Sequence, residues 1–131
     1  MPRTCQIDPN GGTVEIKLSV DNALISGGDF KIYDFNSGTL NENFKMHTDT
    51  TGTTSHQSIL APANLVGQVL SWQILTCSPV ITNSGTLTLE IFQNGNLCTT
   101  LPAATYNLSS VPNCSLNQAL PVQGGLHFIN P

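Results

Sequence analysis

The sequence predicts a single-domain, all-β protein in which two antiparallel sheets pack as a sandwich. Its 131 residues, taken as one domain from 1 to 131, suit one hydrophobic core. Short segments of alternating apolar and polar residues recur at roughly ten-residue spacing, with turn-forming residues between them. No window of the chain has a convincing helical period. A jelly roll and an immunoglobulin-like Greek key both fit this spacing.

The clearest element is a β-hairpin around Asn94-Gly95. Leucine and isoleucine alternate with polar residues over positions 87–91, which is the pattern of a half-buried strand. Asn-Gly is the strongest short-range signal for a two-residue type I′ turn, because both positions need a positive φ. The resulting register pairs Phe92 with Leu97 on the outward face.

Other strands follow from the same alternation, most cleanly over Val14 to Val20. In the segment 30–35 the apolar side chains change face, which predicts either two covered faces or a β-bulge. The tryptophan, Trp72, falls on the apolar face of a long strand and is expected in the core, whereas Tyr33 and Tyr106 are freer candidates for an exposed ring on which a sugar could stack. The remaining strands are expected near residues 42–48, 69–77, 104–108, 119–122 and 126–129.

The four cysteines indicate an oxidising compartment and hence a secreted or cell-surface protein. Cys5, Cys77, Cys98 and Cys114 form no C-x-x-C pair and no zinc-ligand spacing, and an even count suits two disulfides. Four buried free thiols are the alternative. If the strands near 70–77, 85–93 and 96–101 form a meander, Cys77 and Cys98 lie about 9–10 Å apart. This is too far for a disulfide. A Cys98–Cys114 bond would close a short loop that contains proline and would leave Cys5 to pair with Cys77, so we expect these two bonds.

Composition and charge exclude several partners. Only 9% of the residues are charged, the net charge is -4, and the four cations all lie within the first 45 residues. No basic stripe is present for phosphates or for anionic lipid, so we expect no nucleic-acid partner. No apolar run is long enough for a transmembrane segment. Met1-Pro2-Arg3 is interpreted as a start methionine and a short extension on a mature secreted chain.

Catalytic and metal-binding patterns are weak. The three histidines are isolated in sequence, and no G-x-S-x-G elbow occurs, so we expect no enzyme activity. Asp34, Asn36 and Glu42 lie in an oxygen-rich stretch that suits calcium, although the spacing is not that of an EF-hand. The favoured alternative is a polar turn in which Asp34 and Asn36 bond their own backbone. No other cofactor is expected.

Neutral polar residues point to a binding function. The chain contains 13 Asn, 15 Thr, 11 Ser and 7 Gln, whose side chains suit the hydroxyl groups of sugars. We interpret the polar run from Thr48 to Ser58 as a loop rather than as a Thr-rich edge strand, and loops often carry function. The candidate ligand-binding residues are Thr50, Thr51, Thr53, Ser55, His56, Gln57 and, on a separate strand, Tyr33.

The sequence therefore favours a secreted, non-catalytic binding module that takes an extracellular glycan or protein and serves in carbohydrate binding or adhesion. The alternative is a self-assembling structural subunit of an extracellular fibre, pilus or coat, in which copies of the chain associate. Two segments, Asn107-Leu108-Ser109 and Asn113-Cys114-Ser115, also match the acceptor pattern for N-glycosylation.

Overall fold

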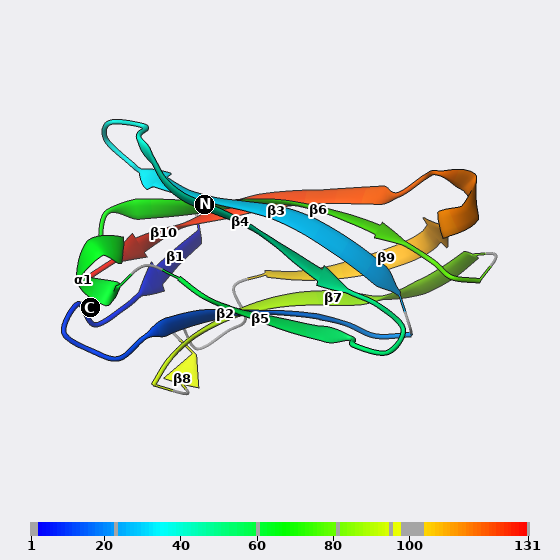
Figure 1. The fold of residues 1–131 in the computed structure, drawn as a ribbon, viewed down its shortest axis with the longest axis horizontal. Helices are drawn as coiled ribbons and strands as arrows, with labels where there is room; N and C mark the ends of the chain where they lie inside the picture. The colour runs from blue at the N-terminus through cyan, green and yellow to red at the C-terminus, as the bar shows by residue number, and fades with distance from the viewer. Residues whose placement is uncertain are drawn as a thin grey trace.

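A computed structural model describes residues 3–22, 24–59, 61–80, 82–94, 96–97 and 104–130. It shows the predicted sandwich of two mostly antiparallel sheets (Figure 1). Sheet A has the order β1, β10, β6, β3, β4 and sheet B the order β5, β2, β7, with both β8 and β9 paired to β7. The strands are β1 Arg3–Gln6, β2 Val14–Val20, β3 Ile25–Asp34, β4 Leu40–Thr48, β5 Thr54–Ser58, β6 Gln68–Cys77, β7 Thr82–Gln93, β8 Asn96–Leu97, β9 Ala104–Pro112 and β10 Leu120–Ile129.

Most connections cross from one sheet to the other. Only the β3–β4 connection and the β7–β8–β9 run stay within a sheet. Strand β1 is the exception to antiparallel pairing among the described strands, because it runs parallel to β10 at the edge of sheet A. Two short helical turns, α1 (Pro62–Leu65) and η1 (Cys114–Leu116), lie in the β5–β6 and β9–β10 connections, and both of these connections cross from sheet B to sheet A.

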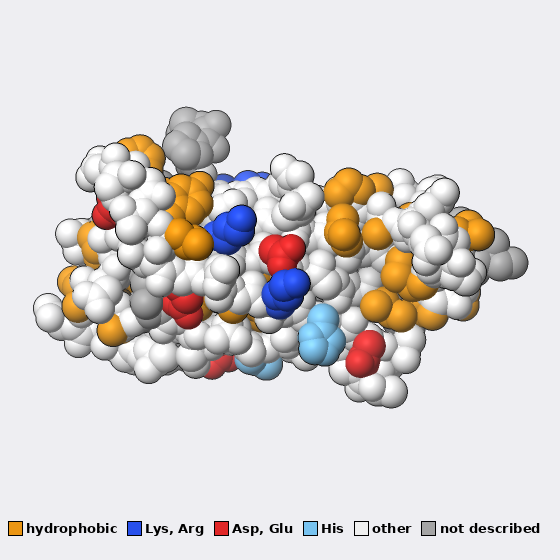
Figure 2. All heavy atoms as spheres, turned by 45° about the horizontal axis from the view of Figure 1, so that its top comes forward, with side chains coloured by type: hydrophobic (Ala, Val, Ile, Leu, Met, Phe, Trp, Pro, Cys, Tyr) orange, Lys and Arg blue, Asp and Glu red, His pale blue; other side chains and the backbone are white. Residues whose placement is uncertain are grey.

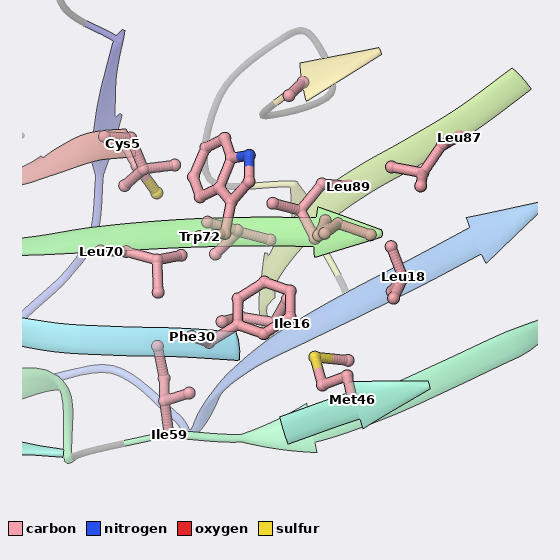
Figure 3. Close-up of a cluster of buried hydrophobic side chains, with 14 of the residues drawn as sticks. Cys5, Ile16, Leu18, Phe30, Met46, Ile59, Leu70, Trp72, Leu87 and Leu89 are labelled. Carbon is pink, nitrogen blue, oxygen red and sulfur yellow. The ribbon is translucent and has the colours of Figure 1, made fainter. Parts of the chain in front are cut away.

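The core lies between the sheets and is built by the alternation that the sequence predicted. The four apolar positions of β2, at residues 14, 16, 18 and 20, are all buried. Figure 3 shows Phe30 and Trp72 of sheet A pointing toward Ile16 and Leu89 of sheet B. This interdigitation of inward side chains is the usual packing of an aligned sandwich.

Trp72 is a core residue, as predicted, and only 2% of its surface is exposed. Its indole N–H donates a hydrogen bond to the Tyr106 hydroxyl oxygen at 2.9 Å, and that hydroxyl donates to the Gln123 carbonyl oxygen at 3.1 Å. The expectation of a surface role for Tyr106 is therefore wrong: its ring packs against the core and its hydroxyl satisfies the buried indole.

The hairpin register is confirmed where the structure describes it. Phe92 pairs with Leu97 and Gln93 with Asn96, and Asn94 has a φ of 57°. The second turn residue, Gly95, lies outside the described residues, as does Cys98. Strand β3 alternates regularly, because its pairing with β6 is continuous from Ile25 to Asp34, so Ile32 points inward and Tyr33 outward. The register irregularity between Ile32 and Tyr33 leaves the extra residue, Asn41, on β4, so the β-bulge alternative is wrong for β3. Phe35 is 60% exposed, so the outward face is not covered there either.

The predicted disulfide pairing is wrong. Cys77 bonds Cys114, with Cα atoms 4.9 Å apart, which rules out both Cys5–Cys77 and Cys98–Cys114. Cys5 is also disulfide-bonded, and no described cysteine is a free thiol. The prediction assumed one meander, but β6 lies in sheet A while β7 and β8 lie in sheet B. The distance argument between Cys77 and Cys98 therefore had no basis.

Candidate binding surfaces

The polar run from Thr48 to Ser58 is not one loop. Residues 54–58 form β5, which pairs antiparallel with β2 and is the edge strand of sheet B. The loop interpretation is therefore wrong for this half, and the alternative of a Thr-rich edge strand is correct. Its polar residues on both faces are typical of an edge that must resist pairing with other chains.

The other half of this run is a tight turn organised by Asp49. One carboxylate oxygen of Asp49 accepts hydrogen bonds from the Thr51 backbone N–H at 2.9 Å, the Thr51 hydroxyl at 2.9 Å and the Gly52 N–H at 2.7 Å. These bonds, led by the Thr51 hydroxyl, lower the pKa of Asp49. Thr51 therefore holds the turn, whereas Thr50 and Thr53 are exposed beside it.

Strand pairing separates the three remaining predicted residues. Ser55 lies opposite Leu18 and Gln57 opposite Ile16, so both are on the inward face at the edge of the sandwich. His56 lies opposite Lys17 and is on the outward face. The six predicted residues of this run therefore do not form one site. They divide among the turn, the inner face of β5 and its outer face.

His56 does contribute to a concave surface. A shallow hollow of about 300 Å³ opens on the outward face of sheet B. We call it the β5 hollow, and its lining residues are Thr13, Glu15, Lys17, His56 and Phe92. Its volume is at the lower end of the range for small-molecule sites.

Charges in and beside the β5 hollow are paired. Nδ1 of His56 lies 2.5 Å from a Glu15 carboxylate oxygen, and both side chains are about half exposed. The Lys17 ammonium lies 4.0 Å from a Glu90 carboxylate oxygen on β7. Phe92 lies opposite Glu15 and offers a half-buried aromatic ring beside these groups. The hollow thus combines one apolar surface with hydrogen-bond donors and acceptors on three adjacent paired strands.

Tyr33 belongs to a second surface, on the outward face of sheet A. Tyr33 pairs with Leu40 and with Val69, and Val69 pairs with His127. The Phe35 ring stacks on the His127 imidazole with centroids 4.5 Å apart. We call these five residues the aromatic patch. Phe35 is 60% and Leu40 is 51% exposed, so much of this apolar surface is in contact with water.

Charged side chains are sparse on the surface, as the composition implies. Figure 2 shows a few Lys, Arg, Asp and Glu side chains near the middle of one face, with hydrophobic side chains gathered toward both ends. The hydrophobic residues most exposed in the described part of the chain are Phe35, Leu40, Leu75, Val80 and Leu116.

The calcium candidate centres on the β3–β4 turn, where Asp34 bonds its own backbone. One of its carboxylate oxygens accepts hydrogen bonds from the backbone N–H groups of Asn36 at 2.9 Å and Ser37 at 2.8 Å. The other accepts from the Gln68 side-chain amide at 3.2 Å, and Gln68 in turn accepts from Asn41. The bond from the Ser37 backbone is the main cause that lowers the pKa of Asp34. This is the polar turn that the sequence favoured.

Glu42 lies on β4 opposite Ile32, while Asn36 is exposed in the turn. The described residues contain no group of three or more His, Cys, Asp or Glu side chains placed to hold a metal. Binding of calcium by Asp34, Asn36 and Glu42 stays a prediction, which a calcium-dependent rise in melting temperature would support. The two turns considered for binding flank β4 at its opposite ends, so they cannot act as one site.

Four residues of the β5 hollow were not among the predicted binding residues: Thr13, Glu15, Lys17 and Phe92. A signal existed for the last three, because they occupy outward positions in alternating strands. The sequence alone does not say that β2, β5 and β7 are neighbours, and only that adjacency gathers them.

Comparisons with known proteins give no family. No protein-family model matches the chain, and no curated protein or solved structure is significantly similar to it. Within the described residues, no helix has the length and apolar character needed to span a bilayer.

Proposed function

We propose that this protein is a secreted, non-catalytic binding module that holds an extracellular glycan in the β5 hollow. The observation that supports this proposal is the position of Phe92 beside the polar groups of Glu15, Lys17 and His56 in one concavity. Ligand sites typically combine an apolar surface with a few well-placed polar groups.

The chemistry of these groups suits a sugar. A sugar presents an apolar C–H face, which the Phe92 ring would accept, and hydroxyl groups that both donate and accept hydrogen bonds. The Glu15 carboxylate accepts, the Lys17 ammonium donates, and the Thr13 hydroxyl does both. Lys17 and Glu15 project from a strand that is paired on both sides, so little further backbone ordering would accompany binding.

Secretion is supported by the cysteines. The Cys77–Cys114 disulfide and the bonded state of Cys5 are typical of a small domain from an oxidising compartment. The proposal of binding without catalysis rests on the sequence, which offers no nucleophile elbow and no sequence-defined catalytic pair.

The alternative, a self-assembling subunit of an extracellular fibre, pilus or coat, is favoured by a different observation. The aromatic patch exposes Phe35 and Leu40 on the sheet A face, where a second copy of the chain would cover them. Exposed apolar clusters on small proteins are common at interaction surfaces.

Glycan binding is tested by a glycan array followed by titration of any sugar retained. Phe92→Ala should weaken binding at least tenfold, because it removes the phenyl ring from the described lining of the hollow. The control is Thr105→Ala, an exposed position on β9 of the same sheet. Equal affinity of the Phe92→Ala protein and the wild type would remove the β5 hollow as the site.

Self-assembly is tested separately by sedimentation velocity. If copies associate through the aromatic patch, Phe35→Ser should convert the assembly to monomers, while Phe92→Ala should not. A wild-type protein that is monomeric at all accessible concentrations would contradict the alternative.

A further inference from the structure

The two N-glycosylation patterns are in very different structural settings. Asn107 lies in the middle of β9 and Asn113 directly precedes η1. Glycosylation adds a large, hydrophilic group to the side-chain amide, so a modified asparagine must have its amide in open solvent in the folded protein.

The Asn113 side chain is held by hydrogen bonds to neighbouring residues. Its side-chain oxygen accepts hydrogen bonds from the Ser115 backbone N–H at 2.8 Å and from the Ser115 hydroxyl, which caps η1. Its side-chain N–H group donates to the Val80 carbonyl oxygen. The next residue, Cys114, is held by the disulfide to Cys77 and donates its backbone N–H to the Ser78 carbonyl at 2.8 Å. A sugar on this amide would replace one hydrogen of a nitrogen that already contacts the Val80 carbonyl oxygen, and so would crowd that contact.

The Asn107 side chain, by contrast, is exposed to solvent. Asn107 lies opposite Thr86 on the outward face of sheet B. Its neighbours Tyr106 and Leu108 point inward, so the backbone direction is fixed by core packing. Ser109, which completes the acceptor pattern, is exposed as well. Nothing in the described structure must move to place a glycan here.

We propose that Asn107 is an N-glycosylation site and that Asn113 is not, when the chain passes through a secretory compartment that performs this modification. The Nδ2 atom of Asn107 forms a bond to the anomeric carbon of an oligosaccharide carried on a polyprenyl pyrophosphate. The bond from that carbon to the pyrophosphate oxygen breaks, one amide proton is lost to the transferase, and the lipid pyrophosphate leaves. Both the donor and the transferase belong to the host cell.

The position of Asn107 gives the glycan a structural consequence. Strand β9 pairs with β7 on one side, and no described strand pairs with its other side. Unpaired edges of sheets promote association between chains. A glycan rooted in the middle of β9 would shield this edge and oppose edge-to-edge assembly.

The test is secretion of the full chain, fused to a cleavable leader, from cultured mammalian cells. Intact mass is measured before and after treatment with peptide N-glycosidase. The wild type should carry one glycan, Ser109→Ala should carry none, and Ser115→Ala should keep it. Ser109→Thr preserves the acceptor pattern and should restore the glycan, which separates loss of the pattern from misfolding.

Release of a folded wild-type protein at the unmodified mass would overturn the proposal, and so would a glycan that persists in Ser109→Ala. The inference rests on the secretory location in the proposed function. Because the leader supplies that location, and because glycan binding is measured on unmodified protein, failure of either proposal can be recognised without the other.

Discussion

Removal of the Cys77–Cys114 disulfide should lower the free energy of unfolding by about 3.8 kcal/mol. The two residues are 37 positions apart in sequence. In the chain-entropy relation for a cross-link, a loop of this length reduces the entropy of the unfolded chain by about 13 cal/mol/K, or about 3.8 kcal/mol at room temperature. This lies within the range of roughly 2–5 kcal/mol typical of native disulfides in small secreted domains.

The native fold should survive this change. Around the disulfide, the Ser78 N–H donates to the Pro112 carbonyl at 2.7 Å and the Cys114 N–H donates to the Ser78 carbonyl at 2.8 Å. These backbone hydrogen bonds do not depend on the sulfur atoms. The effect should therefore arise mainly in the unfolded chain, which becomes less restricted, and the urea m-value should rise because more surface is exposed on unfolding.

The measurement is urea unfolding of the double variant Cys77→Ser, Cys114→Ser against the wild type, followed by the fluorescence of Trp72, which is buried in the core. Both proteins are kept without reductant so that the bond of Cys5 is retained. A loss below about 1 kcal/mol would refute the chain-entropy argument. Peptide mapping that links Cys98 to Cys114 would refute the pairing itself.

Three further changes test the core and the turns. Gly28→Ala should cost about 1–3 kcal/mol, because its Cβ would lie 2.8 Å from the nearest side-chain atom, whereas at Gly27 nothing lies within 4 Å and alanine should be neutral or stabilising in thermal unfolding. Tyr106→Phe should cost about 1–3 kcal/mol in urea unfolding, because the buried indole N–H loses its acceptor. The lowered pKa values of Asp34 and Asp49 mean that their turns are stabilised above the ordinary aspartate pKa. This contribution is lost as the pH falls through the folded-state values, and hydrogen exchange of the turn amides should accelerate there.

The strands that were predicted correctly are those whose buried and exposed faces can be recognised from the pattern of their own residues. Strand β2 alternates perfectly because one face meets the core and the other meets solvent. The hairpin after β7 has its register fixed by Asn94, whose positive φ needs no distant partner. In both elements the structure is determined by neighbouring residues in the chain, so the sequence is sufficient to predict the strand and its register.

Strand β5 was missed for the opposite reason. Ser55 and Gln57 face inward at the rim of the sandwich, where polar side chains still reach water, so no apolar period appears. Its identity as a strand depends on pairing with β2, some 40 residues away in sequence. The disulfide error had the same origin, because the separation of Cys77 and Cys98 depended on which sheet each neighbouring strand joined.

The two proposed functions use opposite faces of the sandwich, and this makes them independent. The β5 hollow opens on sheet B, whereas the aromatic patch covers one end of the outward face of sheet A. A ligand in the hollow and a second copy on the patch would not compete for the same surface. The face variants Phe92→Ala and Phe35→Ser should therefore each remove one property and leave the other. If either variant removed both, the two surfaces would have to be coupled through the core, and the assignment of separate faces would be wrong.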